Sequence, residues 1–452
     1  MSAESWWCEH AWVGASVQEG VLVGTCAGRI QSVETGVQQP SESESESSLS
    51  VLRGLVLPGL ANAHSHAFHR ALRGRTQQGR GSFWTWREQM YELAARLDPN
   101  SLRQLATAVF AEMALAGVTA VGEFHYLHHK TKGGCYDEPN AMGTVLIEAA
   151  RAAGIRITLL DTCYLTGGFG RPAAGVQTRF SDGDADRWAA RVDDLRRTQG
   201  GTPGVRIGAA IHSVRAVPSD QLGAVARWAA EHDAPLHVHL SEQRAENADC
   251  LAHYGLSPAR VLHDAGVLRP GTTAVHATHL DGDDIALLGG SGCGVCLCPT
   301  TERDLADGIG PGRRLFEAGA PISLGSDGHS VIDLFEEARA VELDERLATE
   351  SRGHWSAPEL LMAMTAAGQA SLGWPDAGGL RPGARADLVA VRRDSVRTAG
   401  CGAMPETAVF AASAADVTDV IVDGVPVVAG GRHLALGDVA GRLAEAVGRL
   451  VR

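Results

Sequence analysis

Two histidines separated by a single residue, His64 and His66, stand at the end of an apolar stretch that begins near residue 55. A β-strand turns residues i and i+2 to the same face, so both imidazoles can bind one metal ion. Further imidazoles and a carboxylate follow later apolar runs, at His237, His239, His276, His279 and Asp327. This recurrence predicts a metal site where the ends of several strands converge.

The proposed metal ligands are three imidazoles and one carboxylate: His64, His66, His239 and Asp327. With water completing the shell, this donor set suits zinc at a catalytic site. His237 we interpret as a core histidine, because it lies two residues, roughly 6–7 Å, below His239 on the same strand. For Asp327 taken alone, the alternative is a helix N-cap.

Two further side chains have the chemistry to move protons beside such a metal. Glu242 lies three residues past His239, and His276 ends the next apolar run. A carboxyl and an imidazole next to a metal-activated water are the groups that hydrolysis needs. We therefore expect Glu242, His276 and Asp327 to be catalytic.

A second group of residues is basic and aromatic. Arg87 ends the aromatic segment 83–87, and Arg215 closely follows His212 at the end of another apolar run. Guanidinium groups bind carboxylates through two parallel hydrogen bonds, so two arginines favour a dicarboxylate substrate. The alternatives are surface arginines and tryptophans that only pack.

Composition limits the class of protein. The formal net charge of −13 argues against a nucleic-acid partner, and no run of 18 apolar residues predicts a membrane span. The first residues do not resemble a secretion signal, and nine scattered cysteines suit reduced thiols in a cytoplasm. We expect a cytoplasmic homodimer that binds a small molecule, and we interpret Cys293, Cys296 and Cys298 as structural.

The order of apolar segments predicts the fold. Eight buried strands alternate with helical patterns and are expected at 55–66, 118–126, 156–161, 205–212, 235–239, 273–276, 294–299 and 321–327. This alternation is typical of a (β/α)₈ TIM-like barrel, whose chemistry lies at the carboxyl ends of its strands. The candidate histidines and Asp327 occupy such ends.

Short strands also occur at both ends of the chain. They lie before residue 57, at 379–391, and at 417–428, where an Asp-Gly pair predicts a hairpin. We expect residues 1–57 and 376–452 to form one small β-sandwich domain, with the barrel at 58–375. The acidic segment 41–48 is predicted to be a solvated loop.

These residues resemble the mononuclear zinc deaminase branch of the amidohydrolase superfamily, over nearly the whole chain. The resemblance implies that His64, His66, His239 and Asp327 bind the metal and that Glu242 and His276 are acid–base residues. Binuclear members carry a carbamylated lysine at a barrel strand end. The two lysines here, Lys130 and Lys132, end no predicted strand, so one zinc ion per chain is expected.

Longer motifs are similar to the formimidoylglutamate deiminases, namely 62–68, 83–87, 123–129, 212–217 and 298–302. The resemblance implies that Arg87, Tyr126, His212 and Arg215 hold the glutamate portion of the substrate. His69 stands where that family usually has glutamine, at a substrate-contacting position. An imidazole there keeps a hydrogen bond and would ordinarily titrate near pH 6.5.

The implied activity is hydrolysis of N-formimidoyl-L-glutamate, a linear amidine, to N-formyl-L-glutamate and ammonia, a step of histidine degradation. Two alternatives remain open. One is a deaminase of another substrate, such as a purine, a pyrimidine or a different imine, which would give no reason for the paired arginines. The other is a catalytically inactive barrel that serves as a scaffold, against which the complete set of metal and acid–base residues argues.

Overall fold

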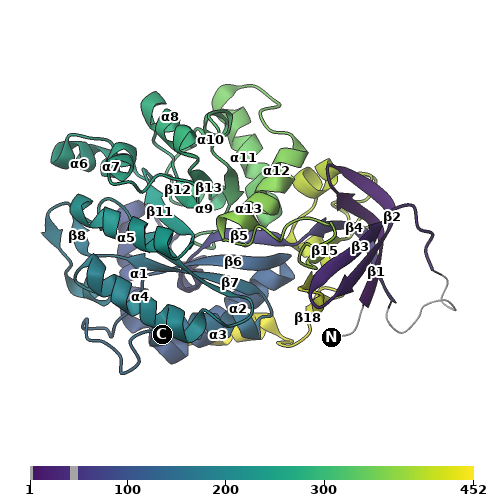
Figure 1. Cartoon of the computed structure of the whole chain (residues 1–452), viewed down its shortest axis with the longest axis horizontal. Helices are drawn as coiled ribbons and strands as arrows, with labels where there is room; N and C mark the ends of the chain where they lie inside the picture. The colour runs from purple at the N-terminus through teal and green to yellow at the C-terminus, as the bar shows by residue number, and fades with distance from the viewer. Residues whose placement is uncertain (1–3, 41–48, 452) are drawn as a thin grey trace.

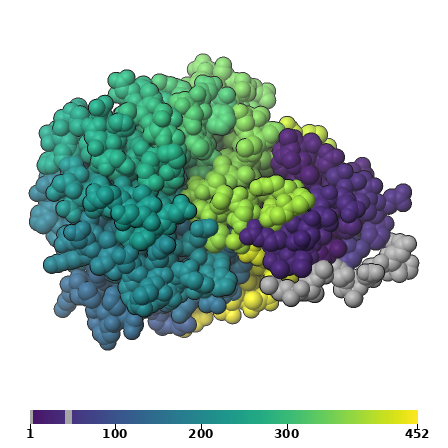
Figure 2. Space-filling model, viewed as in Figure 1, coloured from purple at the N-terminus to yellow at the C-terminus, as the bar shows by residue number. Residues whose placement is uncertain are grey.

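The computed structural model describes residues 4–40 and 49–451; the acidic segment 41–48 lies outside the described residues. Figure 1 shows two parts, a barrel surrounded by helices and a separate sheet beside it that contains the N-terminal strands. In the space-filling view of Figure 2, the N-terminal strands (purple) lie directly against later parts of the chain (green and yellow). Within the described ranges, no helix is both long enough and apolar enough to cross a membrane.

The predicted (β/α)₈ barrel is confirmed. Its eight strands run parallel in the order β14-β13-β12-β11-β10-β7-β6-β5. They are β5 (Leu60–Ser65), β6 (Val118–His125), β7 (Arg156–Cys163), β10 (Val205–Ile211), β11 (Leu236–Leu240), β12 (Thr272–His276), β13 (Gly294–Leu297) and β14 (Ile322–Leu324). A parallel bridge between Ser65 and Asp327 joins the first strand to the segment that follows the last one. That bridge closes the barrel.

Helices cover the outside of the barrel (Figure 1). They include α1 (Phe83–Arg96), α2 (Pro99–Leu115), α3 (Ala141–Ala152), α4 (Ala185–Gln199), α5 (Ser219–Glu231), α6 (Arg244–Tyr254), α7 (Pro258–Asp264), α8 (Gly282–Ser291), α9 (Pro299–Asp304), α10 (Gly312–Glu317), α11 (Leu334–Thr349), α12 (Ala357–Met364) and α13 (Ala366–Ser371). Helix α2 illustrates why they form where they do. The Asp98 side chain accepts a hydrogen bond from the Ser101 backbone amide at 2.7 Å, and proline occupies the first helical position. Most of its apolar residues are buried, and the helix packs between α3 and α14 (Val439–Leu450).

The first apolar stretch, predicted as a barrel strand at 55–66 with the domain boundary after residue 57, is divided between two sheets. Strand β4 (Leu49–Pro58) belongs to the terminal sheet, and β5 begins the barrel immediately after Gly59. A Cβ atom at Gly59 would lie 2.3 Å from Thr119 Oγ1 and 2.6 Å from Asp387 Cβ. Glycine therefore lets the chain pass between the two parts, which no apolar periodicity reveals.

The terminal sheet draws strands from both ends of the chain. Its order is β18-β17-β16-β15-β4-β1-β2-β3, from β1 (Glu4–Val13), β2 (Ser16–Cys26), β3 (Arg29–Glu34), β4, β15 (Leu388–Val391), β16 (Val417–Val422), β17 (Val425–Ala429) and β18 (Arg432–His433). The two ends meet where β4 pairs antiparallel with β15. Asp423 and Gly424, both with positive φ, turn β16 into β17 as a hairpin requires. The last helix, α14 (Val439–Leu450), returns to pack against α2 of the barrel.

A buried ion pair joins the barrel to the terminal sheet. Arg156, at the start of β7, binds both oxygens of the Asp387 carboxylate and lies 3.1 Å from Asp423 Oδ1. The Arg156 and Asp387 side chains are only 2% and 1% exposed. Arg156, Arg206 and Arg385 also stack around the Trp374 ring, with guanidinium carbons 4.6–5.5 Å from its centroid.

We expect Arg156→Met to lower the free energy of unfolding by about 3–5 kcal/mol, because it leaves the Asp387 carboxylate buried without its partner. Urea unfolding measures this change. A matched control is Arg392→Gln, which removes an exposed, solvent-screened pair with Asp394 and should change the stability far less. Equal stability of the two variants would show that the interface does not depend on Arg156.

Candidate metal and active site

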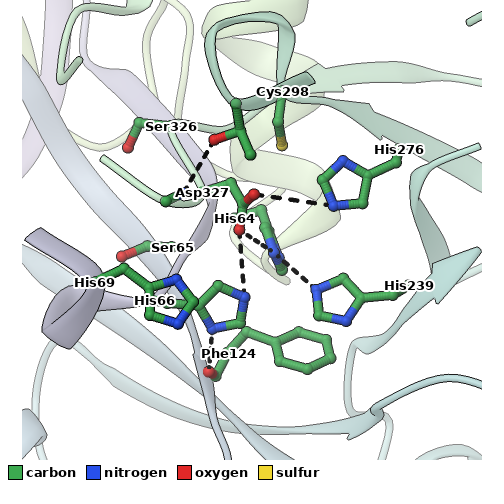
Figure 3. Close-up of polar contacts among 12 residues, drawn as sticks. His64, Ser65, His66, His69, Phe124, His239, His276, Cys298, Ser326 and Asp327 are labelled. Atoms are coloured by element: carbon green, nitrogen blue, oxygen red, sulfur yellow. Dashed lines mark hydrogen bonds and ion pairs between the residues drawn. The ribbon is translucent and has the colours of Figure 1, made fainter. Parts of the chain in front are cut away.

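Four histidines and one aspartate converge at the carboxyl ends of the barrel strands (Figure 3). His64 Nε2 and His66 Nε2 lie 3.2 and 3.3 Å from Asp327 Oδ1. His239 Nε2, from β11, lies 3.1 Å from His64 Nε2. The ring of His276, at the end of β12, faces the other Asp327 oxygen at 3.9 Å. The structure thus brings together all four side chains that the sequence predicted as ligands.

The surroundings of these rings fit a bound cation. His66 Nδ1 donates to the Phe124 carbonyl at 2.9 Å, and His239 Nδ1 donates to the His212 carbonyl at 3.0 Å. In this tautomer the Nε2 atoms of His66 and His239 are unprotonated and can bind a metal ion. His64 Nε2 lies 3.1 Å from His239 Nε2 and 3.2 Å from Asp327 Oδ1, so these three donors are close enough to share one divalent ion.

Burial keeps these ligands in the protonation states that a metal requires. It lowers the pKa of His64 to about 3 and also lowers the pKa values of His66 and His239. Burial alone would raise the pKa of Asp327, but the hydrogen bond from His64 and the nearby imidazoles hold it well below its usual value. Neutral imidazoles and a charged carboxylate are the forms that bind metal.

The donor atoms form two overlapping groups. Those of His64, His239, His276 and Asp327 all lie within 4.8 Å of one another, and so do those of His66, His69 and Asp327. Asp327 belongs to both groups and is therefore the centre of the site. His237 belongs to neither, because its Nε2 hydrogen-bonds the Ser371 carbonyl at 3.0 Å.

Backbone hydrogen bonds hold the two ends of the barrel sheet together at this site. The Asp327 amide donates to the His64 carbonyl at 3.0 Å, and the His66 amide donates to the Asp327 carbonyl at 3.2 Å. Ser65, between the two histidines, points to the opposite face and lies 2.6 Å from Glu123 Oε2. Asp327 and His276 both adopt positive φ, 39° and 68°. Such conformations cost on the order of 1–3 kcal/mol and persist where surrounding contacts impose them.

Glu242 and His276 lie next to this cluster. His276 Nε2 is 3.9 Å from Glu242 Oε1, and its Nδ1 is 3.4 Å from Glu302 Oε1. Burial raises the pKa of Glu242 to about 7, so near neutral pH the carboxyl can both donate and accept a proton. Burial would lower the pKa of His276, but Glu242, Glu302 and Asp327 outweigh it and raise that pKa well above its usual value.

One pocket contains both predicted groups of residues. Its wall includes the acid–base residues Glu242, His276 and Asp327 and the residues expected to bind substrate, which are His69, Arg87, Tyr126, His212 and Arg215. Arg215 is largely buried, with its side chain 15% exposed, and lies 4.0 Å from Glu246 Oε2. Arg87 stacks on the Trp84 ring, with 4.5 Å between its guanidinium carbon and the centroid. A small ligand in this pocket can therefore contact both the histidine–aspartate cluster and the two arginine side chains.

His69 differs from its sequence-based expectation in one respect. It lies in the helical turn η1 (Ala67–Leu72), is buried, and its Nε2 is 2.9 Å from the Tyr126 hydroxyl. Burial, followed by the nearby His66, lowers the pKa of His69 well below the usual value. The expected titration near pH 6.5 is therefore wrong, because the buried ring stays neutral.

Sequence reasoning missed several residues of the pocket wall. Tyr91 lies one helical turn after Arg87, so helical spacing could have placed it on the same face. Tyr164 directly follows β7, so its position at a strand end could have indicated that it lines the pocket. Gln177 donates to both tyrosine hydroxyls at 3.1 Å, and no sequence pattern marked it. Glu302 was part of a recognised motif, but its contact with His276 required the fold.

Comparison with known proteins agrees with this geometry. A model of the amidohydrolase family matches residues 55–427, which include the barrel and most of the C-terminal strands. The chain belongs to the amidohydrolase family. The crystal structure of an amidohydrolase from Brucella melitensis superposes with a TM-score of 0.91 at 32% identity, covering 99% of this chain and 100% of that one.

Several relatives similar to this chain in sequence are deaminases or deiminases. Formimidoylglutamate deiminase of Pseudomonas aeruginosa is 37% identical over 416 residues, which cover 88% of this chain and 90% of the relative. The 8-oxoguanine deaminase of the same organism is 31% identical over 416 residues, with 89% and 90% covered. The protein is therefore a deaminase of the amidohydrolase superfamily, a hydrolase that acts on carbon–nitrogen bonds.

We expect His69→Gln to leave the pH profile of ammonia release unchanged between about pH 5.5 and 7.5, because the buried imidazole does not titrate there. Glutamine can also replace the hydrogen bond to Tyr126. His69→Leu should destabilise the protein by about 1–3 kcal/mol, because it leaves the buried Tyr126 hydroxyl with only the weak acceptor Met90 Sδ, at 3.7 Å. A flattened profile in the glutamine variant would mean that His69 ionises in this range.

Proposed function

We propose that the protein is a zinc-dependent formimidoylglutamate deiminase of histidine degradation. It would hydrolyse N-formimidoyl-L-glutamate to N-formyl-L-glutamate and ammonia, in the cytoplasm and as a homodimer. The observation that carries this proposal is the pocket in which Arg87 and Arg215 share one wall with Glu242 and the histidine–aspartate cluster. Guanidinium groups are suited to both carboxylates of the substrate.

The proposed metal ligands are His64, His66, His239 and Asp327, with one zinc ion per chain. Imidazole nitrogens and one carboxylate are usual zinc donors, and a catalytic site keeps a position for water. The carbonyl groups of Phe124 and His212 orient two of the rings. When bound, zinc supplies the Lewis acidity that lets water act as a nucleophile near neutral pH.

The side chains of the pocket would carry the remaining steps. Asp327 accepts one proton of the attacking water, whose oxygen forms a bond to the formimidoyl carbon, and His276, which is protonated because its pKa is raised, orients that water. Glu242, with its pKa raised to about 7, donates a proton to the imine nitrogen. The proton held by Asp327 then passes to the same nitrogen, and the new hydroxyl group returns its proton to Glu242. The carbon–nitrogen bond to that nitrogen breaks, ammonia leaves, and the carbon keeps the oxygen as a formyl group.

The remaining residues would hold the glutamate portion. Arg87 and Arg215 would pair with the two carboxylates, while Tyr126, His212 and His69 would provide hydrogen bonds at the centre of the pocket. His69 and Tyr126 are already hydrogen-bonded to each other, so they present one joined polar surface to the substrate.

The direct test is a coupled ammonia assay with N-formimidoyl-L-glutamate. Parallel assays use N-formimidoyl-L-aspartate, 8-oxoguanine and 5′-methylthioadenosine, because purine deaminases are also similar to this chain. We expect turnover of the glutamate substrate and little of the purines, which offer no carboxylates to the arginines. Turnover of a purine alone would refute the proposed substrate.

The purified protein should contain one divalent metal ion per chain, most readily zinc. Metal analysis of the wild type and of His64→Ala/His66→Ala tests this, and the double variant should lose the ion. His237→Gln is the matched control on β11 and should retain it, because that ring faces the Ser371 carbonyl instead. Two ions per chain, or full occupancy in the double variant, would contradict the ligand assignment.

Replacing Glu242 with glutamine should reduce kcat by about 10²–10⁴-fold, the usual contribution of a general acid or base. Metal content should stay at the wild-type level, because Glu242 is not a proposed ligand. Steady-state kinetics and metal analysis of the same preparation separate these effects. A metal-loaded Glu242→Gln enzyme with normal kcat would remove the residue from the mechanism.

Arg215→Met should lower kcat/KM for N-formimidoyl-L-glutamate by roughly 10–150-fold, the loss expected for one or two charged hydrogen bonds. The methionine retains most of the apolar stem of the side chain. Arg206→Met is a suitable control, because Arg206 stacks on Trp374 near the other end of the barrel. An unchanged kcat/KM in Arg215→Met would show that the substrate carboxylates bind elsewhere.

A further inference from the structure

A second hollow adjoins the pocket on the far side of its two arginines. Arg87 and Arg215 line both spaces, and the outer one also includes Phe169, Arg171, Asp249 and His253. We call these six residues the outer hollow. Because Arg87 and Arg215 line both spaces, the two spaces adjoin at these side chains.

The outer hollow is rich in positive charge within a chain whose net charge is −13. Three arginines face a single carboxylate, that of Asp249. Arg171 is exposed, and among residues 4–40 and 49–451 its side chain has neither a hydrogen bond nor an ion pair. Its guanidinium group can therefore bind an anion without breaking a hydrogen bond or an ion pair.

Arg171 is held at this place by a short hairpin, β8 (Thr166–Gly168) and β9 (Arg171–Pro172). Thr166 Oγ1 donates to the Arg215 carbonyl at 3.1 Å, which ties the base of the hairpin to the pocket wall. At the tip, the Phe169 ring packs against His253 and Tyr254 of α6, with centroids 5.6 and 5.8 Å apart. The hairpin thus places the exposed Arg171 on the wall of the hollow that Arg215 also lines.

We propose that the outer hollow is a carboxylate subsite, in which Arg171 recognises the side-chain carboxylate of the substrate. This inference rests on the proposed function, because it takes the ligand to be an N-substituted glutamate. In such a molecule the reacting group is attached to the nitrogen on Cα. When that group lies at the histidine–aspartate cluster, the side-chain carboxylate is the part of the ligand that extends farthest from it. It then lies where Arg87 and Arg215 meet the outer hollow, and Arg171 makes the site selective for a dianion.

The test measures equilibrium binding of two ligands to the metal-loaded protein by calorimetry. N-formyl-L-glutamate has the side-chain carboxylate, and N-formyl-L-glutamine has a neutral amide in its place. Arg171→Gln should weaken binding of N-formyl-L-glutamate about two- to fivefold at low salt, as expected for an exposed charge pair. Binding of N-formyl-L-glutamine should stay the same, and high salt should remove the difference.

Three further variants complete the design. Arg171→Lys keeps the charge and should restore most of the affinity, whereas Arg171→Glu should weaken N-formyl-L-glutamate more than Arg171→Gln does. Arg151→Gln removes one exposed arginine from the end of α3, just before β7 begins and so at the opposite end of the barrel, and should bind like the wild type.

The outcomes separate the two proposals. If the wild type binds N-formyl-L-glutamate and Arg171→Gln binds it equally well at low salt, the outer subsite is refuted while the proposed function stands. Equal weakening of both ligands would also refute the subsite, because the effect would then not involve the side-chain carboxylate. If the wild type binds neither ligand, both the proposed substrate class and the proposed subsite are refuted.

Discussion

The closure of the barrel is the interaction on which the active site depends. The amide and carbonyl groups of Asp327 bond to those of His64 and His66, and this single bridge joins the first strand to the end of the last. Because both histidines and the aspartate flank the bridge, the contact that completes the sheet also brings their side chains together. Any shift in the register of β5 would separate the imidazoles from Asp327 and turn Ser65 toward the metal position instead.

Burial of the charged and polar side chains at the site sets the protonation states on which its chemistry depends. Removing imidazoles from water lowers their pKa values and leaves them neutral, while the aspartate they surround stays charged. A few ångströms away, burial has the opposite effect on Glu242, because isolation from water disfavours its charged form. Neutral donors for a cation and a carboxyl that can give up a proton near pH 7 therefore arise from one cause.

The residues proposed to bind the substrate include several that lie on elements outside the barrel strands. Arg87 lies on α1, Arg215 on the loop after β10, and the hairpin β8–β9 on an insertion between β7 and α4. Loops that follow barrel strands can change without disturbing the sheet, which is how one fold serves many substrates. The relatives of this chain illustrate the point, because formimidoylglutamate and 8-oxoguanine deaminases share its family but not a substrate.

The sequence alone determined the strand order along the chain, the HxH pair, and the carboxylate and imidazoles at later strand ends, because strand periodicity and parallel barrels leave few other arrangements. It also carried the family resemblance. Only the tertiary structure decided that Gly59 divides the first apolar stretch, that His69 is buried and neutral beside Tyr126, and that Gln177 joins Tyr91 to Tyr164. These features depend on contacts between residues far apart in sequence and on the solvent excluded around them, and neither quantity is encoded in local spacing.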